Sequence, residues 1–100
     1  MIWRIQFTAL AADDVADAYA WYAASRSGLG EAFLADVERV LEVIKQYPEA
    51  CPVAHRTLRR GLLNQFPYSV YYRLLPATAT IEMRACVHQR QHPRTWRRRA

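Results

Sequence analysis

The chain has 100 residues, of which 52% are hydrophobic and 23% are charged, and its formal net charge is +5. This length is typical of one domain and leaves no room for two separate cores, while the composition is too apolar for an intrinsically disordered chain. We therefore expect residues 1–100 to fold as a single domain.

The charge is distributed unevenly between the two halves of the chain. Residues 1–50 have a net charge of −4 and residues 51–100 have a net charge of +9, with Glu82 the only acidic residue of the second half. A basic half predicts an anionic partner, which can be nucleic acid, a membrane surface or an acidic protein segment. Of the 14 basic residues, 13 are arginine. Arginine suits bidentate contacts with phosphates and carboxylates, although a GC-rich genome would produce the same composition.

The N-terminal segment predicts a strand. Within residues 2–7, the apolar side chains of Trp3, Ile5 and Phe7 alternate with Ile2, Arg4 and Gln6, and this period of two is typical of a β-strand with one buried face. Such alternation is unlike a signal peptide or a membrane span, so we expect a cytoplasmic protein that makes no membrane contact.

Two amphipathic helices are predicted next. Thr8 is placed to cap the first helix, and the second begins at Glu31 and ends before Pro48. The apolar stripe expected on the first helix comprises Ala12, Val15, Ala16, Tyr19, Tyr22 and Ala23. Because the connection at residues 25–28 is short, we expect an antiparallel helical hairpin.

The remainder predicts three strands, over residues 57–66, 68–75 and 79–87, which gives an α+β fold with a three-stranded antiparallel sheet. The side chains expected to lie under the helices are Tyr68, Val70, Tyr72, Leu74, Ile81, Met83, Ala85 and Val87. The opposite face, expected to be open, would carry Tyr71, Arg73, Glu82, Arg84, Cys86 and His88. A basic tail follows at residues 92–100, in which Trp96 is expected to pin the tail to the domain.

This order of elements resembles the toxins of the RelE/ParE superfamily of type II toxin–antitoxin systems, a group that includes plasmid stabilisation proteins. The resemblance lies mainly in three segments, F-P-Y-S-V-Y-Y at 66–72, I-E-M-R-A-C-V-H-Q-R at 81–90, and the tail with Pro93, Trp96 and Arg97 to Arg99. The helix with Ala12, Asp14 and Tyr22, and Y-P-E-A at 47–50, are similar to the first half of the family.

The resemblance implies a growth-inhibiting toxin that a cognate antitoxin neutralises, with operator DNA bound only through the antitoxin and with no cofactor. ParE-like members inhibit DNA gyrase, whereas RelE-like members are mRNA interferases that cut mRNA on the ribosome. V-H-Q-R at 87–90 is closer to the ParE-like branch. Asn64-Gln65 stands where RelE-like enzymes often carry an arginine, which argues against RNA cleavage.

The residues themselves leave both activities open. Cleavage of RNA by its 2′-hydroxyl needs a base, and cations that stabilise the charge on the phosphate. His88, Arg84 and Arg90 are the catalytic candidates if the protein is a ribonuclease. His88 has two other interpretations, a contact to gyrase or a hydrogen bond to a carbonyl group of the tail. The residues expected to form a binding surface are Arg59, Arg60, Tyr71, Arg73, Trp96 and Arg97.

Other site chemistries find no support in the sequence. The potential soft metal ligands are Cys51, Cys86, His55, His88 and His92, and their spacing matches no zinc pattern. We therefore expect no metal site and reduced cysteines. Glycine-rich phosphate loops and G-x-S-x-G motifs are also missing from the sequence.

Overall fold

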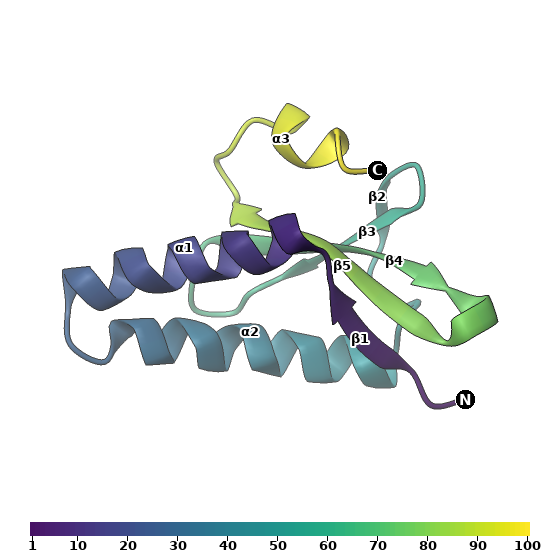
Figure 1. The fold of residues 1–100 in the computed structure, drawn as a ribbon, viewed down its shortest axis with the longest axis horizontal. Helices are drawn as coiled ribbons and strands as arrows, with labels where there is room; N and C mark the ends of the chain where they lie inside the picture. The colour runs from purple at the N-terminus through teal and green to yellow at the C-terminus, as the bar shows by residue number, and fades with distance from the viewer.

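Two antiparallel helices cover one face of a five-stranded sheet, and a short C-terminal helix lies on the other face (Figure 1). The computed structural model describes residues 1–100. Its elements in chain order are β1 (Arg4–Phe7), α1 (Ala9–Ser25), α2 (Leu29–Gln46), β2 (Val53–His55), β3 (Leu58–Leu62), β4 (Tyr68–Leu75), a 3₁₀ turn η1 (Pro76–Thr78), β5 (Thr80–His88) and α3 (Arg94–Arg97). The α+β fold with a helical hairpin is confirmed.

The sheet is mixed rather than purely antiparallel. Its strand order is β1-β5-β4-β3-β2, and β1 runs parallel to β5, with Arg4 opposite Thr80 and Phe7 opposite Met83. The N-terminal strand therefore joins the sheet beside the last strand instead of standing apart from it. The segment expected as one strand at 57–66 contains the shorter β3, and β2 is an additional strand that the sequence did not predict.

The helical hairpin forms as expected, but its apolar stripe is rotated. Thr8 caps α1 by accepting a hydrogen bond from the backbone N–H of Ala11 at 3.2 Å. The α1 side chains that pack into the core are those of Ala11, Val15, Ala18 and Tyr22. Ala12 and Ala16 are exposed, so the expected stripe was wrong by about one residue. Spacings of three and four residues recur in both stripes, so the alanine-rich sequence fits either one.

A β-bulge in β5 changes which side chains face the helices. Tyr71 pairs with Ala85 and Tyr72 pairs with Met83, so Arg84 has no partner of its own. Such an extra residue shifts the alternation of the strand by one. The helical core therefore receives Met83 before the bulge and Cys86 after it.

The expected orientation of four β5 side chains was therefore wrong, and one of them is His88, which was expected on the open face but pairs with Tyr68 and packs against it on the helical side. Ala85 and Val87 do not lie under the helical hairpin but belong to a second cluster on the opposite face of the sheet. Cys86, expected on the open face, is buried in the helical core. The alternation holds only as far as the bulge at Arg84.

A buried carboxylate ties the hairpin to the loop between β3 and β4. Asp36 on α2 is fully buried and accepts hydrogen bonds from the backbone N–H groups of Asn64, Gln65 and Phe66, at 3.1, 2.8 and 3.0 Å. It also pairs with the guanidinium of Arg39 at 3.2 Å. Three amides of this loop, including the buried N–H of Phe66, therefore depend on this one side chain.

Replacing Asp36 should destabilise the protein far more than replacing an exposed acid of the same helix. Asp36→Ala leaves the buried N–H of Phe66, and the part-buried N–H groups of Asn64 and Gln65, without their acceptor, at up to roughly 1–3 kcal/mol per group, so we expect the free energy of unfolding to fall by about 3 kcal/mol. Urea unfolding followed by circular dichroism measures this change, with Glu38→Ala as the control. Equal stability of the two variants would contradict the assigned role of Asp36.

Candidate functional site

The C-terminal tail covers part of the sheet face that the sequence predicted to be open. The Trp96 ring of α3 stacks on Tyr71, with ring centroids 4.1 Å apart and an interplanar angle of 12°. Both side chains are buried, and they pack in one cluster with Leu58, Ala85 and Val87. Trp96 therefore pins the tail. Tyr71 was expected on an open face of the sheet, and this expectation was wrong because the tail covers it.

Charged side chains fix the end of the tail to the rest of the protein. Arg99 contacts both carboxylate oxygens of Asp14 on α1, at 2.6 and 3.4 Å. Arg84 and Arg99 are also joined reciprocally: Arg84 Nε donates to the Arg99 carbonyl at 2.7 Å and Arg99 Nη1 donates to the Arg84 carbonyl at 3.1 Å. Asp14 accepts a further hydrogen bond from the backbone N–H of Cys86 at 2.9 Å. One carboxylate thus joins α1, β5 and the tail.

A row of three charged side chains continues from Arg84 across the sheet. Glu82 Oε1 accepts hydrogen bonds from Arg73 at 2.7 Å and from Arg84 at 3.0 Å. Partial burial acts to raise the pKa of Glu82. Hydrogen bonds from the two guanidinium groups, together with their positive charges, outweigh this effect and hold that pKa below its usual value of 4.5. Arg73 and Arg84, both expected to serve the site, are therefore engaged in contacts within the protein.

His88 lies on a different side of the sheet from the Arg84 row. Its ring packs against Tyr68, which contacts the helical core, with ring centroids 5.3 Å apart. Its Nδ1 accepts a hydrogen bond from the backbone N–H of Arg90 at 3.0 Å, rather than donating to a carbonyl of the tail. Arg90 is exposed in the turn after β5. His88 and Arg90 thus meet through the Arg90 backbone, whereas the Arg84 side chain is held by another set of contacts.

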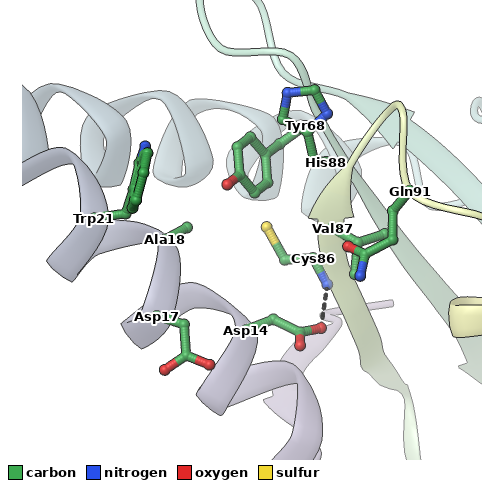
Figure 2. Close-up of a pocket in the computed structure, with 9 residues that line it drawn as sticks. All are labelled: Asp14, Asp17, Ala18, Trp21, Tyr68, Cys86, Val87, His88 and Gln91. Carbon is green, nitrogen blue, oxygen red and sulfur yellow. Dashed lines mark hydrogen bonds between the residues drawn. The ribbon is translucent and has the colours of Figure 1, made fainter.

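A pocket of about 340 Å³ opens beside His88, between α1 and the end of β5 (Figure 2). Its lining residues are Asp14, Asp17, Ala18, Trp21, Tyr68, Cys86, Val87, His88 and Gln91. Trp21 stands at this pocket with 69% of its surface exposed, although a large aromatic side chain is normally covered. The sequence did not indicate this pocket, because Asp17 and Trp21 lie outside the apolar stripe predicted for the helix.

The chemistry of this pocket suits binding rather than nucleophilic catalysis. Burial, and then the nearby Asp14 carboxylate, raise the pKa of the Cys86 thiol to about 12, so the reactive thiolate is not formed at neutral pH. The remaining lining includes two carboxylates, the polar side chains of His88 and Gln91, and the aromatic surfaces of Trp21 and Tyr68. Such a combination fits an apolar group with a nearby cation.

The other residues expected to form the binding surface have diverse roles. Arg59 donates to the carbonyls of Glu49 and Cys51, at 3.0 and 2.8 Å, and so holds the segment between α2 and β2. Arg60 is exposed. Arg97 lies over the Trp96 ring, 5.5 Å from its centroid. Of these three arginines, only Arg60 and Arg97 are thus available to form an ion pair with a binding partner.

Comparison with known proteins identifies the family of this chain and a solved structure with a similar fold. Residues 5–93 match the model of the ParE toxin of the type II toxin–antitoxin system, parDE. The chain belongs to the ParE toxin family. A search of curated proteins gave no match. A solved structure described as the chromosomal ParDE toxin–antitoxin system from P. aeruginosa is similar, with a TM-score of 0.62, 19% identity, and coverage of 87% of this chain and 96% of that one.

Nowhere do three or more His, Cys, Asp or Glu side chains gather in a way that could hold a metal ion. None of the helices combines the length and the apolar character that crossing a membrane requires.

The charged row predicts a specific loss of stability in acid. Because the pKa of Glu82 is lower in the folded protein, its stabilising contribution is fully present above the usual value of 4.5 and is lost as the pH falls through the lowered value. Glu82→Gln should therefore be less stable than the unmodified protein at pH 7, and this difference should shrink as the pH falls toward 3. Urea unfolding at several pH values measures it, with the exposed Glu42→Gln as the control. A difference that stays constant with pH would contradict the ionic role of Glu82.

Proposed function

We propose that this chain arrests growth by binding DNA gyrase and that a cognate antitoxin neutralises it. The observation that carries the proposal is the match of residues 5–93 to the ParE toxin family. The geometry of the candidate catalytic residues favours the same conclusion. The guanidinium of Arg84 is held by Glu82 and by the Arg99 carbonyl, so it does not converge with His88 on one substrate.

The hydrogen bonding of His88 supports a binding role. Because Nδ1 accepts the Arg90 N–H, a neutral imidazole in this position carries its proton on Nε2. The available nitrogen is then a hydrogen-bond donor, which suits a contact to a protein partner and does not suit the removal of a proton from a ribose hydroxyl. Asn64 and Gln65 also supply backbone N–H groups to Asp36 and place no cation beside β4.

Cleavage of mRNA on the ribosome is the second candidate function. The presence of His88 at the end of β5 and of an exposed Arg90 two residues later favours it, since a base and a cation are both needed for RNA cleavage. Tail contacts weigh against it, because Trp96 and Tyr71 stack on each other and offer no surface to an unpaired base.

Two assays on purified toxin, together with variants of His88, separate these functions. We expect the toxin to arrest growth when produced alone, to inhibit supercoiling by gyrase, and to leave mRNA on programmed ribosomes uncut. His88→Gln should keep most of the toxicity because an amide can replace the hydrogen bond, whereas loss of a general base would reduce a cleavage rate by about 10²–10⁴-fold. Ribosome-dependent cleavage by the unmodified protein that His88→Gln abolishes would establish the ribonuclease instead.

The antitoxin is proposed to insert an apolar anchor and a cation into the pocket of Figure 2. Trp21 and Tyr68 supply the apolar contact. Asp17, which forms no ion pair within the chain, supplies a charge for a basic side chain of the antitoxin. The site lies between the helical hairpin and the exposed end of β5, where an extended or helical segment can contact both.

Trp21→Ala should weaken the complex with the antitoxin encoded beside the toxin. Truncating an aromatic anchor of an interface typically costs ~1.4 kcal/mol or more, which is about tenfold in affinity. Tyr47→Ala is a matched control, since Tyr47 is 63% exposed and lies near the end of α2, away from this pocket. Calorimetric titration of the two variants measures the difference. Equal affinities would place the antitoxin elsewhere.

A further inference from the structure

Two adjacent hollows by the tail are lined by five nitrogen-bearing side chains and one threonine, with no acidic or hydrophobic residue. The larger, of about 360 Å³, is lined by His55, His92, Arg94, Arg97 and Arg98. The smaller, of about 190 Å³, shares His92, Arg94 and Arg98 and adds Thr95. We call these five nitrogen-bearing residues the tail cluster. It brings β2 together with the segment after β5, which are far apart in the sequence.

The arginines of the tail cluster are not neutralised within the protein. The four ion pairs of the chain use Arg39, Arg73, Arg84 and Arg99, and none of them involves Arg94, Arg97 or Arg98. Three guanidinium groups this close in sequence repel one another, and this repulsion is relieved when an anion binds between them.

The structure holds the tail cluster in place before any partner binds. α3 is fixed at its centre by the stacking of Trp96 on Tyr71 and beyond its end by the pairing of Arg99 with Asp14. His92 Nδ1 accepts the backbone N–H of Arg94 at 3.0 Å, so the other ring nitrogen is left as a donor. His55 packs against Trp96, with ring centroids 6.2 Å apart. Preorganised donors lose less conformational entropy when a ligand binds.

The lining indicates phosphate rather than protein as the ligand. Protein interfaces usually have an apolar centre, and these hollows contain no apolar residue. Guanidinium groups match phosphate oxygens in geometry and charge. Recognition of single-stranded RNA needs aromatic side chains on which unstacked bases can lie, but Trp96 and Tyr71 are buried against each other. The tail cluster therefore suits the backbone of a duplex.

We propose that the tail cluster binds the backbone phosphates of duplex DNA without regard to sequence. This inference rests on the proposed function, since gyrase holds duplex DNA and a toxin bound to gyrase would have that DNA within reach. The contact adds electrostatic affinity for the gyrase–DNA complex over gyrase alone. It differs from the operator DNA contact expected through the antitoxin, because it reads no bases.

Binding of the toxin to a fluorescently labelled duplex, measured over a range of salt concentrations, tests this site without gyrase. Each phosphate contact that is lost should reduce the slope of log affinity against log salt by about one. Arg94→Gln with Arg98→Gln should therefore reduce the slope by about two, on two duplexes of unrelated sequence. Arg26→Gln with Lys45→Gln removes the same charge from the helical hairpin and should leave the slope nearly unchanged. Thermal unfolding verifies that both double variants remain folded.

The outcomes separate the DNA contact from the proposed function. Equal slopes for the two double variants would overturn the DNA site, even if the toxin inhibits gyrase. A toxin that binds DNA through Arg94 and Arg98 but does not affect supercoiling would retain the site and refute the gyrase target. If the Arg94 and Arg98 variant lost affinity for the antitoxin while binding DNA as before, the tail cluster would be a site for an acidic protein segment, and the DNA proposal would be wrong.

Discussion

The unpaired residue of β5 is the constraint on which the arrangement of the candidate sites depends. Because Arg84 stands between the residues paired with Tyr71 and Tyr72, the strand reverses its faces part-way along. Ala85 and Val87 are thereby turned away from the helices and form the surface on which Trp96 packs. Without this reversal the tail would keep its stacking on Tyr71 but would lose the contacts with Ala85 and Val87, and the tail cluster would be held less firmly.

Asp14 acts together with this bulge. Beyond the bulge, β5 has no neighbouring strand on its β1 side, since the pairing of β1 ends at Phe7 opposite Met83. The Asp14 carboxylate accepts the N–H of Cys86 there, and so satisfies a backbone donor that a strand would otherwise have to pair. The same carboxylate is held by the guanidinium of Arg99. A basic tail therefore compensates the charge of an acid that is partly buried.

The sequence predicts the elements better than it predicts the site. The strand predicted at 68–75 was found over the same residues, because the side chains of β4 alternate regularly and Pro67 and Pro76 bound it. The helical hairpin was predicted because its caps and apolar spacing are local signals. The features that the sequence did not predict depend on contacts between residues that lie far apart in the chain. The bulge is a property of the pairing of two strands, and the roles of Asp36 and Arg99 follow from contacts 28 and 85 residues away in the chain.

The difference between local signals and contacts made only in the folded chain also explains why some predicted site residues are exposed and others are engaged within the protein. Arginine has one chemistry but several uses, and only the folded chain shows which guanidinium groups already have partners. Arg59 binds carbonyls of a loop and Arg84 binds Glu82, so both stabilise the fold. Arg94 and Arg98 form no ion pair, although nothing in their sequence positions distinguishes them from the other arginines. Arginines without a partner lie together on the tail, whereas Asp17 and Trp21 lie exposed on α1. Two surfaces of opposite charge on one small protein can bind two different partners, which is what a toxin with both a target and an antitoxin requires.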